Sequence, residues 1–265
     1  MTVNAKIATP WEIVDGKTIS QWSRDWFQWV ASADATTPVG APFGTYPAPD
    51  GQVHAASAAF GTVGQDGPVF FLYGGPWGAP NPSASNLALD PTINVPVGKD
   101  ILAPLINGVE AETGKAADST LPEWPSTHLP YSVEAKFVPA LVNLSIDEAH
   151  LSVAKTSDPT HPFLTLDWPA SNFHAADSGV FSLGTPKPGS YLASVPLTGS
   201  DVPYADVAGR WAMIENLPKG DYVVNFGGSG HAIHNPLNPG AIVDGFSGPN
   251  GSDWKAETTD ILHVA

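Results

Sequence analysis

The sequence predicts an all-β fold, an antiparallel β-sandwich of jelly-roll type with one N-terminal Trp-rich α-helix packed on it. Glycine and proline, 26 and 27 residues of 265, separate short apolar segments, which is typical of many strands joined by long connections. Hydrophobic residues make up 42% of the chain and include nine tryptophans, so it can fill a core and is not a disordered chain. We therefore expect a single β-sandwich domain over residues 1–265.

A stretch near the C-terminus carries the clearest strand pattern. Residues 209–228 show two-residue spacing on both sides of a turn at 217–221, which contains proline and glycine. This pattern places four large side chains on sheet faces: Trp211, Met213, Tyr222 and Phe226. We expect two successive strands joined by a tight turn and ended by the glycines at 227–228.

The predicted helix covers residues 18–31, within an N-terminal arm and helix at 1–35. Thr18 and Gln21 form a capping-box pair at its start. Three indoles share one face of this helix: Trp22, Trp26 and Trp29. Such a stripe either packs in a core or forms a platform for stacking on sugars, and core packing is the favoured interpretation.

The remaining strands are predicted from apolar runs between turn signals. Residues 68–75 indicate a buried strand with a glycine end, and 93–96 with 101–108 indicate a second hairpin-like unit. Further strands are expected near 133–138, 141–146, 149–155, 162–167, 179–183, 190–195 and 258–264. The segments 109–130 and 229–257 are expected to be surface insertions.

Composition excludes several classes of function. The net charge is −15, with eleven basic and 26 acidic residues and no basic cluster, so nucleic acid and anionic membrane surfaces are unsuitable partners. The absence of cysteine excludes disulfides, zinc–thiolate sites, iron–sulfur clusters and thiol nucleophiles. We find no phosphate-binding glycine loop, nucleophile elbow or His-Glu-x-x-His motif, and we expect no nucleotide cofactor.

The N-terminal residues contain no apolar segment of the kind found in signal peptides, so none is predicted. No run approaches the ~18 apolar residues that a membrane helix needs, and we expect no membrane insertion. These features leave three alternatives open: the protein is cytoplasmic, the sequence is numbered from a trimmed form, or the protein leaves the cell by a route that needs no N-terminal signal.

A histidine pair suggests a metal site. His231 and His234 lie three residues apart in a glycine-rich segment, and Asp244 and Asp253 follow in the same predicted insertion. Two imidazoles and a carboxylate are a common ligand set for a divalent ion, either calcium or a transition metal. The alternative is that these residues are ordinary hydrogen-bonding groups in a turn-rich loop.

Tryptophans in predicted loops are the other candidate contacts for a ligand. Trp124 and Trp168 each precede proline, and we expect them to plug the ends of the sandwich. Trp77 and Trp254 remain candidates for a stacking surface that binds a small molecule or a glycan.

Several segments together resemble a family of uncharacterised bacterial, mostly secreted proteins. They are the Trp-rich helix, residues 67–74 (GPVFFLYG), 95–107 (VPVGKDILAPLIN), 209–214 (GRWAMI) and 217–228 (LPKGDYVVNFGG). The resemblance implies export and a β-sandwich, and no reaction. The chain departs from the family by lacking cysteine and a signal peptide and by carrying residues 229–257 before its last strand.

We therefore expect an extracellular or cell-envelope binding or structural protein of bacterial origin, stabilised by a metal ion, whose partner is a small molecule, a glycan or a second copy. One alternative is a metal-dependent hydrolase or oxidase that uses His231, His234 and Asp244. Another is a self-assembling surface or matrix protein that pairs edge strands.

Overall fold

The computed structural model describes residues 4–9, 11–32, 46–47, 53–54, 64–72, 92–113, 145–168, 174–179, 181–184, 203–231, 234–235, 238–242 and 254–265. It describes the backbone alone at 46–47, 53–54, 108–113, His174, 203–204, 234–235, 238–242, Trp254 and Ala256. The strands expected near 133–138 and 190–195 lie outside the described residues.

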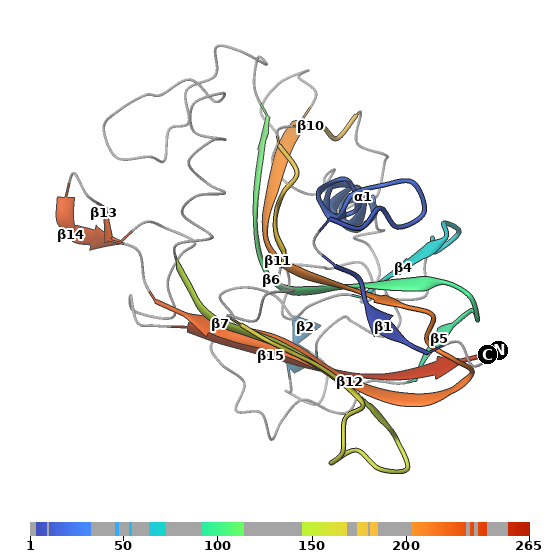
Figure 1. The fold of residues 1–265 in the computed structure, drawn as a ribbon. Coiled ribbons are helices and arrows are strands. Elements are labelled where there is room, and N and C mark those ends of the chain that lie inside the picture. The colour runs from blue at the N-terminus through green and yellow to red at the C-terminus, as the bar shows by residue number, and fades with distance from the viewer. Residues whose placement is uncertain are drawn as a thin grey trace.

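Two sheets and one helix form three layers, with the six-stranded inner sheet between α1 (Ile19–Ala31) and the five-stranded outer sheet (Figure 1). The inner sheet contains β1 (Lys6–Ile7), β4 (Val69–Phe71), β6 (Asp100–Thr113), β9 (His174–Asp177), β10 (Phe181–Ser182) and β11 (Pro203–Glu215). The outer sheet contains β5 (Ile93–Val95), β7 (Ile146–Lys155), β8 (Leu164–Asp167), β12 (Gly220–Gly230) and β15 (Trp254–Val264). The predicted all-β fold with one N-terminal helix is confirmed.

Two short ribbons complete the described strands. They are β2 (Tyr46–Pro47) with β3 (Val53–His54), and β13 (His234–Asn235) with β14 (Asn238–Ile242). Most pairings are antiparallel, but β4 pairs with β6 and β5 with β15 in parallel. The sheets are therefore mixed, since these two short strands enter their sheets through connections long enough to reverse direction.

Successive strands cross between the sheets at two places where the sequence suggested hairpins. β11 pairs with β6 in the inner sheet, whereas β12 pairs with β7 and β15 in the outer sheet. In the same way β5 lies in the outer sheet and β6 in the inner one. The hairpin expectation is wrong at both sites, because a turn signal predicts reversal of the chain and says nothing about the pairing partner. Leu217 in the first connection is buried in the core, which ties that crossing to both sheets.

Strands also extend beyond their predicted ends. β6 continues to Thr113, inside the segment 109–130 that we expected to be an insertion. β12 continues through its glycines to Gly230, and β15 begins at Trp254. The expected glycine stop at 227–228 is wrong, because neighbouring strands on both sides supply hydrogen bonds that hold these glycines in the ladder.

The helix begins as predicted. The Thr18 side chain accepts a hydrogen bond from the Gln21 backbone N–H, and the Gln21 side chain accepts one from the Thr18 N–H. Trp22 and Trp26 are 4% and 2% exposed and face the inner sheet, where the Trp26 ring lies 5.1 Å from the ring of Trp211. The core interpretation of these two tryptophans is confirmed.

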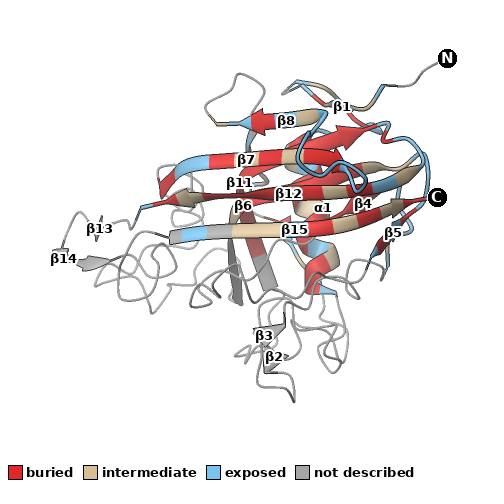
Figure 2. Cartoon of the chain, turned by 90° about the horizontal axis from the view of Figure 1, so that it is seen from below, coloured by how far each residue is buried: buried red, intermediate tan, exposed pale blue. Residues whose placement is uncertain are grey.

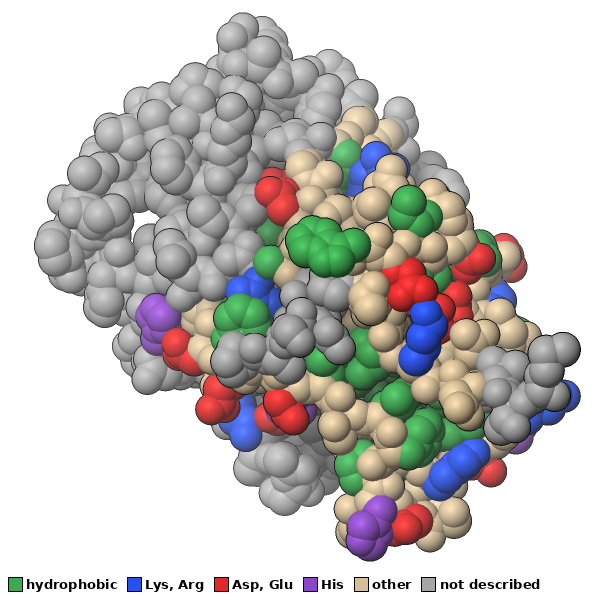
Figure 3. All heavy atoms as spheres, in the orientation of Figure 1, with side chains coloured by type: hydrophobic (Ala, Val, Ile, Leu, Met, Phe, Trp, Pro, Cys, Tyr) green, Lys and Arg blue, Asp and Glu red, His purple; other side chains and the backbone are tan. Residues whose placement is uncertain are grey.

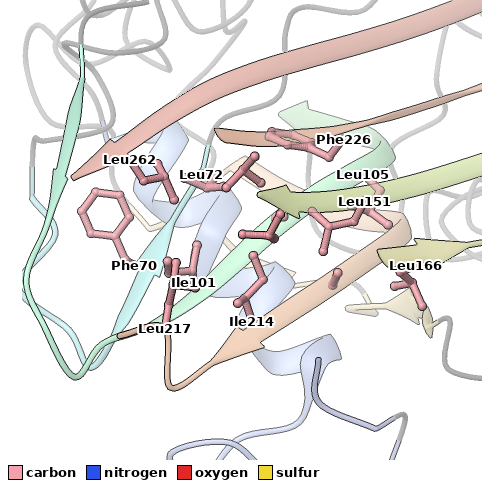
Figure 4. Close-up of a cluster of buried hydrophobic side chains, with 14 of the residues drawn as sticks. Phe70, Leu72, Ile101, Leu105, Leu151, Leu166, Ile214, Leu217, Phe226 and Leu262 are labelled. Carbon is pink, nitrogen blue, oxygen red and sulfur yellow. The ribbon is translucent and has the colours of Figure 1, made fainter. Parts of the chain in front are cut away.

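The fold has two cores, one between α1 and the inner sheet and one between the two sheets. Figure 4 shows the core between the sheets. Inner-sheet side chains such as Ile101 and Ile214 meet outer-sheet side chains such as Leu151, Phe226 and Leu262 there. Each of these five residues is at most 1% exposed. Burial of apolar area at both interfaces of the inner sheet is the main stabilising contribution to this fold.

Each sheet contains one bulge beside a glycine. The register shifts between Arg210 and Trp211 in the inner sheet and between Ser229 and Gly230 in the outer sheet. A Cβ atom on Gly209 would lie 2.2 Å from the Ile106 carbonyl oxygen, and one on Gly228 would lie 2.0 Å from the Glu148 carbonyl oxygen. Both bulges therefore require glycine for close backbone approach.

Candidate functional site

The face of the outer sheet that points away from the core is polar and open to solvent (Figure 2). Along β7, β12 and β15, buried side chains alternate with partly or fully exposed ones. The polar positions of this face form rows across the strands, the second of which passes through the buried Gly227: Lys255–Ser229–Glu148, Glu257–Gly227–His150–Asp167, Thr259–Asn225–Ser152–Thr165 and His263–Asp221. Hydrogen-bonding groups thus line much of this face, interrupted by the apolar row Ile261–Val223–Ala154 between the third and fourth rows.

At the middle of the face, His150 on β7 reaches Glu257 on β15 across Gly227 of the intervening strand. His150 Nε2 lies 2.9 Å from Glu257 Oε2, and the missing side chain of Gly227 leaves room for this contact. The hydrogen bond to Glu257 raises the pKa of His150, although partial burial opposes it. Partial burial raises the pKa of Glu257, but contacts with His150 and Lys255 outweigh this and lower the pKa overall.

At one end of the same sheet, His231 contacts Asp147. The distance from His231 Nδ1 to Asp147 Oδ1 is 2.9 Å, and both side chains are about half exposed. The bulge in β12 and β7 makes Asp147 and Glu148 both point to solvent. The His231 N–H donates to the Ser145 carbonyl oxygen at 2.9 Å, so backbone and ring of this histidine are both held.

Two other histidines have similar contacts. His263 Nδ1 lies 2.6 Å from Asp221 Oδ1, and His161 Nδ1 lies 2.7 Å from Asp158 Oδ1 in the turn after β7. All four histidines whose side chains the structure describes therefore contact a carboxylate. In Figure 3, histidine side chains lie beside acidic side chains on the face that is shown.

The predicted metal ligands are only partly within the described residues. His234 lies in β13, where its backbone pairs with Ile242 of β14. Asp244 and Asp253 lie outside the described residues. Across the described side chains, no group of three or more histidine, aspartate and glutamate residues is arranged to hold a metal ion. The structure instead brings His231 together with Asp147, which the sequence analysis did not select.

The predicted stacking residues can be located in part. Trp254 begins β15 opposite Gly230, with its backbone alone described. Trp77 and Trp124 lie outside the described residues. Trp168 packs against the core between the sheets, as expected for a plug, and the Arg210 guanidinium lies 4.4 Å from the centre of its ring. This cation–π contact fixes Arg210, which is 5% exposed, at the end of that core.

A buried polar cluster on the inner sheet has no signal in the sequence. Asp206 on β11 is 1% exposed, its carboxyl group is hydrogen-bonded to that of Asp177 at the end of β9, and the Ser178 hydroxyl lies 3.0 Å from Asp206 Oδ1. Burial first and the Asp177 carboxylate second raise the pKa of Asp206 to about 7. Aspartates in loops and strands are common, and only the register of β9 with β11 brings this pair together.

Comparisons with protein-family models, with curated proteins and with solved structures find no match to this chain. The resemblance to secreted bacterial proteins therefore stays a prediction. No helix among the described residues is long and apolar enough to cross a membrane. What the fold defines is a class, a β-sandwich protein with a helix on one sheet and a polar face on the other.

Proposed function

We propose that this chain is an extracellular or cell-envelope binding protein that holds a divalent transition-metal ion at the His231 end of the outer sheet. The observation that carries the proposal is the 2.9 Å contact between His231 Nδ1 and Asp147. A histidine that ligates a metal commonly donates its other ring N–H to a carboxylate, which fixes the ring and makes it a better ligand.

The contact assigns different tasks to the two ring nitrogens. Nδ1–H donates to the Asp147 carboxylate, so Nε2 carries the lone pair that a metal ion would take. Glu148, the exposed carboxylate next to Asp147 in the sequence, and His234, three residues after His231, are the further donors that we propose. Imidazole nitrogen favours zinc and similar ions over calcium, which prefers oxygen ligands.

The ligand class for the rest of the face follows from its side chains. Rows of Asn, Ser, Thr and carboxylate groups offer many donors and acceptors to a polyhydroxylated ligand such as a glycan. The acidic character of the chain argues against polyanions as partners. We propose a small molecule or glycan as the bound partner, with the metal ion fixing residues 229–257 beside this face.

Calorimetric titration of metal-free protein with Zn²⁺ and with Ca²⁺ tests the proposal. We expect one Zn²⁺ per chain and weaker or no binding of Ca²⁺. The Asp147→Asn variant keeps its shape but loses the charge that supports His231, so Zn²⁺ affinity should fall about 10- to 100-fold. The double change His231→Ala with His234→Ala should abolish stoichiometric binding.

The matched control is His161→Ala. His161 has the same kind of contact with a carboxylate, at 2.7 Å, in an exposed turn between β7 and β8. This variant should bind Zn²⁺ like the wild type. Equal loss of binding in the control and in the double variant would contradict the proposal, as would unchanged binding in the double variant.

The same samples separate a binding protein from a metal-dependent enzyme. A catalytic ion keeps a coordination position open to water, whereas a structural ion is enclosed by protein ligands. Substitution of Zn²⁺ by Co²⁺ followed by absorption spectroscopy with added azide reports an open position. A spectrum that azide does not change favours the binding role, and a shifted spectrum favours the hydrolase or oxidase alternative.

A further inference from the structure

The attachment of β9 to β11 rests on a small set of contacts. β9 pairs with β11 from His174 opposite Trp211 to Asp177 opposite Ala208. Next to it the Ser178 N–H donates to the Val207 carbonyl oxygen, and the Val207 N–H donates to the Ser178 hydroxyl, both at 2.9 Å. Within the described residues β9 has no other partner strand, so it is a short edge strand that can separate alone.

The carboxyl groups of Asp177, at the end of β9, and Asp206, on β11, require one proton between them. Asp177 and Asp206 are hydrogen-bonded through their side chains, and two ionised carboxylates supply no donor for that bond. The Ser178 hydroxyl has one hydrogen and lies 3.0 Å from Asp206 Oδ1 and 2.9 Å from the Gly179 carbonyl oxygen. It therefore serves one acceptor at a time and does not replace the proton.

Charged groups on the surrounding elements are few. They are His174 and Asp177 on β9, Glu110 in register opposite Asp206 and Glu112 opposite Tyr204 on β6, Arg210 further along β11, and Arg24 with Asp25 on α1, which covers the opposite face of β11. β10 carries no titratable residue. The strongest electrostatic influence on Asp206 is the carboxylate of Asp177, which acts against its ionisation.

We infer that Asp177 and Asp206 form a pH-sensitive latch, which holds β9 on β11 while they share one proton and loosens when the proton leaves. Loss of the proton puts two negative charges side by side, one of them nine-tenths buried or more. Separation of β9 returns both carboxylates to water. It also uncovers Ala176, which is buried in the core beneath α1.

The sign of the pH dependence follows from proton counting. The pKa of Asp206 is raised from its ordinary value near 4 to about 7 when β9 is attached, and it is ordinary when β9 is released. Between these values only the attached state holds the proton. Each unit of rising pH therefore favours release about tenfold, and above pH 7 the dependence levels off.

Hydrogen exchange of single amides tests the latch. The Ser178 amide reports release of β9, and the Leu72 amide, which donates to Leu102 in the inner sheet, reports opening of the whole sandwich. After correction for the intrinsic exchange rate, the opening constant at Ser178 should rise about 50-fold between pH 5 and pH 7. Opening at Leu72 should rise much less.

Variants separate the latch from other causes. Asp206→Asn replaces the buried carboxyl group by an amide that donates at every pH, so opening at Ser178 should change less than about threefold between pH 5 and pH 7. Asp177→Asn removes the neighbouring charge but leaves Asp206 buried, so the rise in opening should be smaller than in the wild type. Asp177 is exposed, so its variant remains informative if Asp206→Asn does not fold. The control is Asp100→Asn, because burial also raises the pKa of Asp100, but its carboxylate accepts from the Asn216 N–H and, among the described residues, shares no hydrogen bond with another carboxyl group.

The control should keep the wild-type pH dependence. Three results would overturn the latch: a flat profile in the wild type, an Asp177→Asn profile as steep as the wild type, or an equal rise at the Leu72 and Ser178 amides.

Discussion

The two sheets of the sandwich differ in how many of their faces are covered. In β11 of the inner sheet every residue from Ala205 to Glu215 is buried, because α1 lies on one face and the outer sheet on the other. In β7 and β12 of the outer sheet, buried residues alternate with partly or fully exposed ones over most of the strand. Packing constrains side chains on both faces of the inner sheet, so among the described strands it is the outer sheet that offers an open face for binding.

The positions of the charged groups agree with this difference. Histidine–carboxylate pairs lie on and around the open face, where water and ions can reach them. Polar residues of the inner sheet, such as Asp206 and Arg210, are buried and each needs specific contacts. The comparison therefore predicts that substitutions in the inner sheet lower the free energy of unfolding strongly. Substitutions on the open face of the outer sheet should lower it little and should affect binding.

The largest expected effect is at Trp211, which is completely buried in β11 against α1. Trp211→Ala should lower the free energy of unfolding by about 3–5 kcal/mol through lost burial and a cavity. Asn225→Ala on the open face removes hydrogen bonds to Thr259 at 2.8 Å and Ser152 at 3.4 Å and should cost about 1 kcal/mol. Urea denaturation measures both, and similar losses would contradict the comparison.

The two bulge glycines test a feature that the sheets share. Gly209→Ala and Gly228→Ala each place a methyl group within 2.2 Å of a backbone carbonyl oxygen, so the strands must separate. We expect each to lower the free energy of unfolding by about 2–3 kcal/mol. The control is Gly67→Ala, whose Cβ would meet nothing closer than 3.9 Å. A loss below about 0.5 kcal/mol at either bulge would show that its backbone approach is not needed.

The cap of the covering helix should have an intermediate effect. Thr18→Ala removes the side-chain acceptor for the Gln21 N–H and one half of the capping box. We expect thermal denaturation to show a loss of about 1 kcal/mol. Ser20→Ala, within the first turn of the same helix, should stay within about 0.5 kcal/mol of the wild type. Equal losses in the two variants would mean that the cap does not hold this helix.

How far these features follow from the sequence differs between the fold and the site. The capping pair and the indole spacing in 18–31 predict α1 closely because both depend on local geometry. Strand positions around 209–228 follow from two-residue alternation. The strand end expected at the glycines is wrong, since neighbouring strands hold Gly227–Gly230 in the sheet. Which sheet each strand joins depends on pairing between distant segments, which local pattern does not encode.

The site was less predictable for the same reason. The His231 and His234 spacing indicated one segment, but its described partner, Asp147, is 84 residues away in sequence. His150 and Glu257 are separated by 107 residues, and Asp177 and Asp206 meet only through the register of β9. No local signal marks these pairs. Their residue types are common in turns, and tertiary structure alone makes them neighbours.

The smallest expected effect is the pH dependence at His150. The Glu257 hydrogen bond raises the pKa of His150, so the stabilisation is full below its ordinary value of about 6.5 and is lost as pH rises through the raised pKa. Both side chains are about one-third exposed, which limits the contribution to about 1 kcal/mol or less. His150→Gln and Glu257→Gln should remove the same step from the stability profile between pH 5 and 8. A step that survives either change would belong to another group.

The most direct test of the open-face account is two-bond ¹H–¹⁵N NMR of the histidine rings during a Zn²⁺ titration. This experiment follows each Nε2 separately, in one sample of unmodified protein. We predict that the His231 Nε2 resonance shifts and saturates at one Zn²⁺ per chain, while those of His161 and His263 do not move. Equal shifts of all three rings at excess Zn²⁺, or no shift at His231, would contradict a binding site at this end of the outer sheet.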